Sequence, residues 1–310
     1  MTTTRPILIP SSNRVLPEQL LPLHPGGPVI ACDFHVESVH LLGEEVESGY
    51  RLGRLLNIDH HAPVARMQRR ICSTHLAIGH VDRAGPVGGD SAVIINHTDC
   101  DSVLSSAILL GLLPPDPAYA GAAIAADHTG EANPIADLLQ ALEHQRDFTG
   151  SLRNLLLIQG GAPMEAGASA RLGERLRRRD RAARLVADGA FRRVGLVDLG
   201  LLEEDTEGEL FPGLLPRAHV IMLAIPCTEP AGSWKMKLRL GPQAPVGLSL
   251  SALGISEFDP RYGGRWNAGS NRRGGGTTMD PQRYAELVSE GLGRALKALA
   301  RRVGTRPRCG

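Results

Sequence analysis

The sequence predicts an α/β protein in which a parallel-sheet metal-binding domain is joined by a helical connector to a smaller α/β substrate-binding domain. Three observations support this class. Short apolar runs alternate with helical patterns, which is typical of a parallel sheet covered by helices on both faces. Four of those runs end in clusters of aspartate and histidine. A helix dense in arginine then separates the first strand–helix set from a second one.

The expected boundaries follow from these patterns. Residues 1–27 are rich in proline and are expected to be irregular, residues 28–160 to form the metal-binding domain, residues 161–192 the connector, and residues 193–310 the substrate-binding domain. A chain of 310 residues is long enough for two domains with substantial cores.

The regular elements are predicted from apolar periodicity and from proline and glycine breaks. In the first domain the expected strands cover 29–32, 54–58, 92–95 and 122–125, and the expected helices cover 102–113 and 134–145. The connector helix is expected over 165–187. The expected strands of the second domain cover 194–198, 219–225 and 235–240.

Charge and cysteine content narrow the class of protein. The net charge is +1 with histidine neutral, so the chain lacks the broad basic surface with which proteins bind long duplex nucleic acid. No C-x-x-C pair is present, which favours a reducing cytoplasm over a disulfide framework. The five cysteines are Cys32, Cys72, Cys100, Cys227 and Cys309. No apolar run reaches membrane length, and neither a signal peptide nor a membrane partner is expected.

Each expected strand of the first domain ends in a cluster of aspartate and histidine. In chain order the clusters are Asp33 with His35; Asp59, His60 and His61; His97, Asp99 and Asp101; and Asp127 with His128. Ligands bind beyond the carboxyl ends of parallel strands, so these side chains are expected to converge. One such cluster alone is most often a polar turn or a helix cap. Four of them at strand ends favour a metal site.

The ligand types indicate which metals fit. Oxygen and imidazole ligands without paired thiolates suit Mn²⁺, Mg²⁺, Co²⁺ or Zn²⁺. Two such ions about 3.5–4 Å apart cleave phosphate esters, because together they hold the attacking and the leaving oxygen. The sequence therefore predicts a metal-dependent phosphoesterase with two divalent ions, Mn²⁺ first and Mg²⁺ or Co²⁺ as alternatives.

A basic strand and a loop rich in glycine and arginine mark the second domain. Lys235, Lys237 and Arg239 alternate with apolar residues and are expected on one face of the strand. In the loop 261–276, glycines let the backbone approach a ligand, and arginines offer forked donors that match phosphate oxygens. The plainer alternatives are a solvent-exposed strand and a flexible connector. In a chain with a metal cluster, the pattern favours phosphate or nucleotide capture, with Trp266 as a surface for base stacking.

With these residues in view, the chain resembles the DHH phosphoesterase superfamily, which includes RecJ-like exonucleases, oligoribonucleases, cyclic dinucleotide phosphodiesterases and family II pyrophosphatases. The matching elements are the triplet Asp59-His60-His61 that names the family, His97-x-Asp99-x-Asp101 of its first motif, and the lone aspartates Asp33 and Asp127. The stretch from the basic strand onward is similar to the smaller DHH-associated domain. The resemblance covers roughly residues 28–280.

The sequence departs from the family pattern in two places. The His97-x-Asp99-x-Asp101 element follows the triplet here, whereas it comes first in the family, so the order looks circularly permuted and Asp33 and Asp127 can exchange roles. Arg265 stands where the family usually has a loop histidine, which makes the contact with substrate more purely electrostatic.

The resemblance implies roles for individual residues. One ion would be held by His97 and Asp99 and the other by His60, Asp101 and Asp127, with Asp33 bridging. His61 would donate to the substrate phosphate or protonate the leaving oxygen, and Asp59 would orient an imidazole. The implied substrate-binding residues are Lys237, Arg239, Arg265, Asn267, Arg272 and Arg273.

The expected function is hydrolysis of short phosphodiesters or small nucleotides by water activated between two metals. The substrate classes are an oligoribonucleotide, a cyclic dinucleotide or a phosphorylated nucleoside. The alternatives are a pyrophosphatase or polyphosphatase and a catalytically silent nucleotide-binding sensor. The expected partner is a small nucleotide or short oligonucleotide, a homodimer is compatible with the sequence, and the expected location is the cytoplasm.

Overall fold

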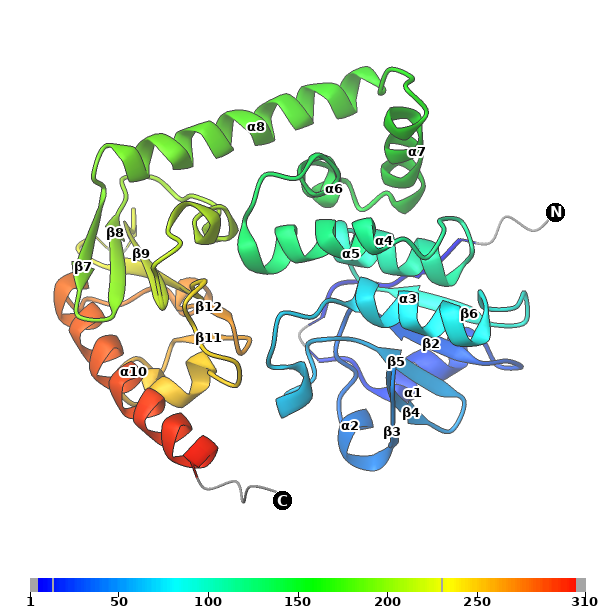
Figure 1. Ribbon diagram of the computed structural model, residues 1–310, viewed down its shortest axis with the longest axis horizontal. Helices are drawn as coiled ribbons and strands as arrows, with labels where there is room; N and C mark the ends of the chain where they lie inside the picture. Colours follow the sequence, from blue (N-terminus) through cyan, green and yellow to red (C-terminus); the bar gives the residue numbers. More distant parts are fainter. Residues whose placement is uncertain (1–4, 13, 230, 305–310) are drawn as a thin grey trace. The chain divides into compact units, whose positions relative to one another are not determined.

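The computed structural model describes residues 5–12, 14–229 and 231–304 and has a mixed α/β architecture with two compact units (Figure 1). Unit 1 runs to Asp127 and resumes from Ala132 to Arg177. Unit 2 comprises His128–Glu131 and the chain from Arg178 onward. Each unit contains one six-stranded sheet. Among the cysteines, Cys309 lies outside the described residues.

The sheet of unit 1 is parallel over four strands and antiparallel over its last two. Its order is β1 (Ile7–Leu8), β6 (Ala92–Ile95), β2 (Val29–Cys32), β5 (Leu55–Ile58), β4 (Gly49–Leu52) and β3 (Glu44–Val46). Strand β2 therefore has parallel neighbours on both sides, with Val29 beside Leu55 of β5 and Ala92 of β6. The carboxyl ends of these three strands meet at one edge of the sheet.

Helices cover the sheet of unit 1, and every residue of β2, β5 and β6 is buried. This pattern explains why the three strands read as uninterrupted apolar runs. The helices of the unit are α1 (Pro17–Leu20), α2 (Val39–Leu42), α3 (Ser73–Ala84), α4 (Cys100–Leu109), α5 (Pro117–Ile124), α6 (Pro134–Leu142) and α7 (Phe148–Gln159). Helix α4 packs against β2 and β6, and α3 packs against β5 and α4.

The fourth expected strand, 122–125, is wrong. These residues lie at the end of α5 and the start of the π-helical turn Ala125–Thr129. Pro117 occupies the first turn of α5, and Asp116 caps it by accepting a hydrogen bond from the Ala118 amide at 2.8 Å. A proline start, an aspartate cap and a run of alanine all stabilise helix, and the absence of β-branched residues from most of the run leaves little to favour a strand.

The N-terminal segment contains more structure than expected. Ile7–Leu8 form the edge strand β1, which pairs in parallel with β6. Arg146 fixes this edge because its guanidinium donates to the carbonyls of Ile9 at 2.7 Å and Asn96 at 3.0 Å. Val15 and Leu20 are buried in the core of unit 1.

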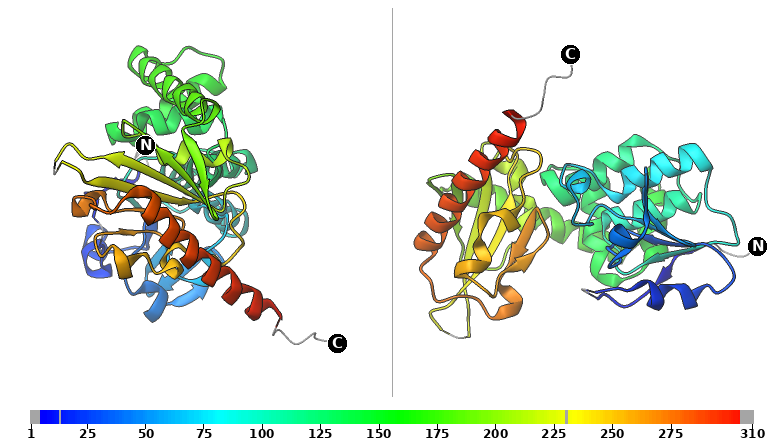
Figure 2. Two further views of the ribbon diagram at one scale, coloured as in Figure 1. Left: turned by 90° about the vertical axis from the view of Figure 1, so that its left-hand side faces the viewer. Right: turned by 90° about the horizontal axis from the view of Figure 1, so that it is seen from below.

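The sheet of unit 2 has the order β11 (Gly263–Gly264), β12 (Ala268–Ser270), β10 (Trp234–Leu240), β9 (Val220–Pro226), β8 (Val197–Leu201) and β7 (Phe191–Val194). Only β8 and β9 pair in parallel; the other pairs are antiparallel. The long helix α10 (Pro281–Gly304) runs across one face of this sheet (Figure 2). Helix α9 (Ile255–Phe258) contacts α10.

The two faces of β10 have different surroundings, as the alternating sequence predicts. Met236, Leu238 and Leu240 are buried in one core with Tyr284 and Val288 of α10. Lys235, Lys237 and Arg239 take the other face and are partly exposed. Lys237 lies beside Leu223 of β9, whose side chain belongs to the second core of the unit.

Helix α8 (Ala166–Ala187) carries the chain from unit 1 into unit 2. Its arginines pair with acidic side chains: Arg177 with Glu174 at 2.7 Å, Arg178 with Glu207 at 2.7 Å and Arg181 with Glu204 at 2.6 Å. These pairs agree with a solvated connector. Among the described helices, none combines the length and the apolar character needed to cross a bilayer.

Gly130 combines a left-handed backbone conformation with close packing against another segment. Its φ is +65°, and a Cβ there would lie 2.1 Å from the carbonyl oxygen of Glu209. We expect Gly130→Ala to destabilise unit 2 by about 3 kcal/mol, because both backbone strain and a clash oppose it. Gly189 is the control: its φ is +79° with open space around it, so Gly189→Ala should cost only about 1 kcal/mol. Equal losses in melting temperature would contradict the packing argument.

Candidate metal centre

Three neighbouring strands place the predicted ligands at one edge of the unit 1 sheet. Asp33 directly follows β2, the triplet beginning at Asp59 follows β5, and His97 follows β6 by two residues. Because β2 lies between β5 and β6, Asp33 is central among them. Asp33 has a positive φ of 61°. Aspartate and asparagine tolerate this conformation better than most residues.

One ligand group consists of Asp33, His97 and Asp99. The Nε2 atom of His97 lies 3.2 Å from Oδ2 of Asp33 and 3.2 Å from Oδ2 of Asp99. One ligand atom from each residue lies within 4.8 Å of the other two, which is close enough to share an ion. Asp99 also caps α4, since its Oδ1 accepts from the Ser102 amide at 2.9 Å.

A second ligand group consists of His60, Asp101 and Asp127, all three buried. His60 Nε2 lies 3.5 Å from Asp127 Oδ2 and 3.9 Å from Asp101 Oδ2. The same nitrogen lies 3.8 Å from Asp33 Oδ1, whereas His97 lies 3.2 Å from the other oxygen, Oδ2. The two oxygens of Asp33 are therefore directed at the two different groups.

The N-terminus of α3 holds the carboxylate of Asp101 in place. Asp101 accepts hydrogen bonds from the amides of Ser73 and Thr74, both at 2.7 Å, and from the Thr74 hydroxyl at 2.6 Å. The Ser73 hydroxyl donates to Asp33 at 2.8 Å. Unpaired amides and the helix dipole favour negative charge at this position.

The histidine rings are fixed with Nε2 directed at the carboxylates. His60 Nδ1 donates to the Ile71 carbonyl at 2.6 Å, and His97 Nδ1 donates to the side-chain oxygen of Asn96. A metal-binding histidine usually donates its other ring nitrogen to an oxygen in this way, which sets the tautomer and leaves Nε2 to bind the ion.

His61 is held by Asp59. The distance from His61 Nδ1 to Asp59 Oδ1 is 2.6 Å, and Asp59 is buried. The Nε2 atoms of His60 and His61 face each other at 2.8 Å. Because both Nδ1 atoms carry protons in these contacts, a proton or a cation is needed near the two Nε2 atoms to offset lone-pair repulsion. His61 also lies within ligand range of Asp33 and His60.

Burial and mutual repulsion shift the ionisation of these groups. Burial, followed by the charges of Asp101 and Asp99, raises the pKa of Asp33 well above its usual value. Burial also raises the pKa of Asp101, with Asp127 adding to the effect. Burial alone would lower the pKa of His97, but the carboxylates of Asp99 and Asp33 raise it well above its usual value. A divalent cation would reverse the repulsion among the carboxylates.

These groups of aspartate and histidine could hold metal ions. The donor set is carboxylate oxygen and imidazole nitrogen, which suits Mn²⁺, Mg²⁺, Co²⁺ or Zn²⁺. Cys32, Cys72 and Cys100 are buried, and burial raises the pKa of each thiol well above its usual value. The candidate ligand groups among the described residues contain only aspartate and histidine. The sequence analysis did not identify Ser73 and Thr74, which donate hydrogen bonds to Asp33 and Asp101.

The predicted substrate-binding residues all lie in unit 2, but they differ in environment. Lys237 forms an ion pair with Asp205, and Arg272 lies 3.7 Å from the same carboxylate. Asn267 is buried, and its amide nitrogen lies 3.5 Å from Nδ1 of His128. Arg239 is partly exposed on β10, and Arg265 and Arg273 are exposed in the glycine-rich loop.

The glycine-rich loop is held by a buried polar network. The carboxylate of Asp259 accepts from the Asn271 amide at 2.9 Å and from the Tyr284 hydroxyl at 3.0 Å. The side-chain oxygen of Asn271 accepts from the Met236 amide at 2.8 Å. Burial and the neighbouring Asp259 raise the pKa of Tyr284, so its hydroxyl keeps its proton and remains a donor. This part of the loop is pinned to β10 and does not fit a flexible connector.

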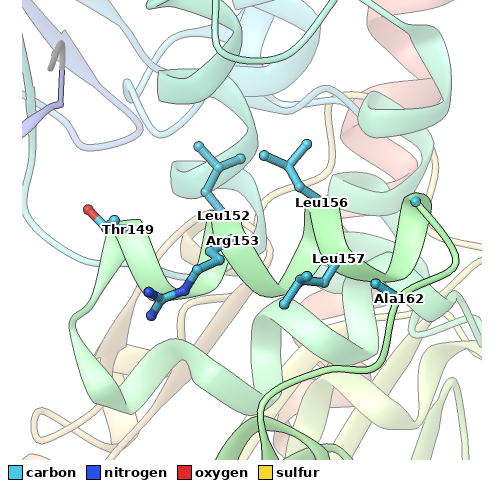
Figure 3. A pocket seen from close by; sticks show the side chains of 7 residues that line it. Thr149, Leu152, Arg153, Leu156, Leu157 and Ala162 are labelled. Carbon is cyan, nitrogen blue, oxygen red and sulfur yellow. The ribbon is translucent and has the colours of Figure 1, made fainter.

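A cavity of about 410 Å³ lies along α7 and has a different chemical character (Figure 3). The described residues that line it include neither a carboxylate nor a histidine. They are Thr149, Leu152, Arg153, Leu156, Leu157, Gly160 and Ala162. The lining residues therefore supply no carboxylate or imidazole that could hold a metal ion.

Comparison with family models found no match, and comparison with curated proteins found none either. Among solved structures, the chain is similar to one described as a pGpG-specific phosphodiesterase, PggH, from Vibrio cholerae. The identity is 11%, the match covers 71% of this chain and 81% of that one, and the TM-score is 0.39. A likeness of this size does not establish a shared fold.

The raised pKa values predict how the metal-free protein responds to pH. Asp33 and Asp101 ionise at higher pH when folded than when unfolded, and His97 holds its proton to higher pH when folded. All three shifts make the folded state bind more protons, so stability should fall as pH rises from about 4, the usual carboxyl value, through the raised values. Mn²⁺ should abolish this decline. Melting temperatures measured from pH 5 to 8 with chelator and with Mn²⁺ test this expectation.

The same repulsion predicts that a neutral side chain at the centre stabilises the metal-free protein. Asp33→Asn should raise the melting temperature in chelator by roughly 2–4 °C, about 1 kcal/mol, since asparagine tolerates the positive φ and carries no charge. It should also reduce the stabilisation by Mn²⁺. Asp82→Asn, on the exposed side of α3, should change neither value. A lower melting temperature for Asp33→Asn in chelator would contradict the repulsion argument.

Proposed function

We propose that the chain is a metal-dependent phosphoesterase that hydrolyses short phosphodiesters or small nucleotides at the edge of the unit 1 sheet. The observation that carries the proposal is the arrangement of Asp33, whose two oxygens face two ligand groups. Two ions held close together by a common carboxylate can stabilise both the attacking and the leaving oxygen of an in-line displacement at phosphorus. The resemblance of the clusters to DHH motifs points to the same reaction.

The ligands in this proposal are Asp33, His97 and Asp99 for one ion and Asp33, His60, Asp101 and Asp127 for the other. When bound, a pair of divalent ions supplies an activated water and neutralises charge on the phosphate oxygens. Mn²⁺ is the ion we expect first, with Mg²⁺ or Co²⁺ as alternatives.

His61 and Asp59 supply the proton transfer in this proposal. Asp59 accepts the Nδ1 proton of His61 at 2.6 Å, which fixes the ring and stabilises its charged form. A proton held at Nε2 of His61 can then pass to the leaving oxygen. The unit 2 residues Lys237, Arg239, Arg265, Asn267, Arg272 and Arg273 are proposed to bind the rest of the substrate.

The runner-up function is a pyrophosphatase or polyphosphatase, because the carboxylate groups suit either reaction. A panel with Mn²⁺ separates them: dinucleotides, cyclic dinucleotides, phosphorylated nucleosides, pyrophosphate and single-stranded DNA. Turnover of pyrophosphate without turnover of any nucleotide would select the runner-up. Nucleotide binding without turnover of any compound would select a sensor.

Removing a ligand from the all-buried group should abolish turnover without unfolding the protein. Asp101→Asn keeps the shape of the side chain but removes its charge, so we expect bound Mn²⁺ to fall from two ions to one and activity to fall at least about 10³-fold. Metal content by elemental analysis and activity on the best substrate of the panel are the measurements. Asp82→Asn is the control, and full activity of Asp101→Asn in chelator would refute the mechanism.

The acid role of His61 predicts a dependence on the leaving group. His61→Gln should lower kcat by about 10²–10⁴-fold on a nucleotide, whose leaving alkoxide needs a proton. Hydrolysis of bis(p-nitrophenyl) phosphate should fall much less, because p-nitrophenolate leaves without one. His144→Gln, at an exposed position, is the control. Equal losses on both substrates, accompanied by loss of bound Mn²⁺, would show that His61 is a ligand and not an acid.

A further inference from the structure

The side chains of Lys237 and Arg272 approach each other in unit 2 because both contact one carboxylate. Asp205 pairs with Lys237 through Oδ1 and lies 3.7 Å from Arg272 through Oδ2. Lys237 projects from the basic face of β10, and its ammonium also donates to the Thr206 carbonyl at 3.1 Å. The Lys237 side chain is only 22% exposed and the Asp205 side chain 33% exposed, so the pair is partly shielded from water.

The acidic loop that carries Asp205 does not need this ion pair for its position. Glu204 pairs with Arg181 at 2.6 Å, and Glu207 pairs with Arg178 at 2.7 Å, so the residues on both sides of Asp205 are attached to α8. Leu202, at the start of the loop, is buried in the second core of the unit. Asp205, between them, pairs instead with Lys237 of β10.

A carboxylate that spans two cations occupies the position that an external anion would take. Ammonium and guanidinium groups bind carboxylate and phosphate by the same charge-assisted hydrogen bonds. A carboxylate attached to the same chain competes at an effective concentration in the millimolar range or above. An external anion displaces Asp205 only if it binds the two cations more strongly than one carboxylate does. This condition favours a doubly charged anion.

We propose that Lys237 and Arg272 form a binding site for a phosphate monoester dianion, and that Asp205 is a built-in competitor that keeps weaker anions out. The proposal rests on the proposed function for the nature of the substrate, but the anion site itself does not depend on hydrolysis. Asp205 then sets the threshold of affinity that a substrate phosphate has to exceed. Removal of this competitor raises the affinity for every anion at the site by the same factor.

The test uses the full chain in chelator and measures binding of methyl phosphate at pH 8, where this monoester is a dianion. Asp205→Asn should bind it about five- to tenfold more tightly than the wild type, as expected for loss of a partly exposed ion pair. Dimethyl phosphate, a monoanion of similar shape, should bind more weakly than methyl phosphate to both proteins. Lys237→Gln should remove the gain when combined with Asp205→Asn.

Glu203→Gln is the matched control, because Glu203 is an exposed residue of the same loop. The substitution removes one negative charge but leaves the pair of Asp205 with Lys237 and the pairs of Glu204 and Glu207 with α8 in place. It should leave the affinity for methyl phosphate unchanged. Equal gains in both variants would mean that net charge and not competition acts, and an unchanged or weaker affinity of Asp205→Asn would mean that Asp205 only supports the fold. Either outcome overturns the proposal. Asp205→Ser repeats the test if Asp205→Asn folds poorly.

Because binding is measured without metal or turnover, the two proposals fail independently. A chain that hydrolyses no ester but shows the expected gain in methyl phosphate binding would retain the anion site and lose the proposed function. A chain that hydrolyses nucleotides but shows no gain would retain the function and lose the role of Asp205.

Discussion

Repulsion among buried carboxylates governs the structure of unit 1. The buried carboxylates of Asp33, Asp101 and Asp127 meet the partly buried carboxylate of Asp99 at the ends of strands and helices, where water screens charge poorly. The pKa of Asp33 and that of Asp101 are raised as a result. The surrounding structure holds them together regardless: the amides of Ser73 and Thr74 fix Asp101, and the Ser73 hydroxyl reaches Asp33. These contacts bring together groups of aspartate and histidine that could hold a metal ion.

The convergence of the strand tips could be foreseen from sequence. Uninterrupted apolar runs indicate buried parallel strands, and parallel neighbours end at one edge, so Asp33, His60 and His97 were expected close together. The role of Ser73 could not be foreseen, because serine and threonine at a helix start usually serve that helix alone. Its contact with Asp33 joins residues 40 positions apart. The strand predicted over 122–125 is wrong because a short apolar run fits a buried strand or a buried helix equally well, and the helix propensity of alanine decides in favour of helix here.

In unit 2, the alternation of basic and apolar residues predicted that Lys235, Lys237 and Arg239 share one face of β10. It did not predict which residues contact that face. Alternation of lysine with apolar residues places Lys237 on the side away from α10. No periodic signal connects it with Asp205, which lies in an irregular loop 32 residues earlier. Ion pairs between loops and strands depend on tertiary structure and leave no periodic pattern in the sequence. The sequence therefore shows Lys237 as a free cation, whereas in the folded chain it is paired with Asp205.

The chain passes from unit 1 to unit 2 immediately after Asp127, and the four residues that follow belong to unit 2. Gly130 packs against the Glu209 backbone, and Arg179 donates to its carbonyl at 2.7 Å. Asp127, a proposed metal ligand, is thus joined by one peptide bond to His128. The segment that begins at His128 packs against residues from far along the sequence. Unit 2 could consequently not be replaced by another domain without affecting unit 1. A gene encoding residues up to 177 alone would leave that segment without its packing partners. Recombination at α8 would therefore disturb the backbone next to Asp127 as well as remove unit 2.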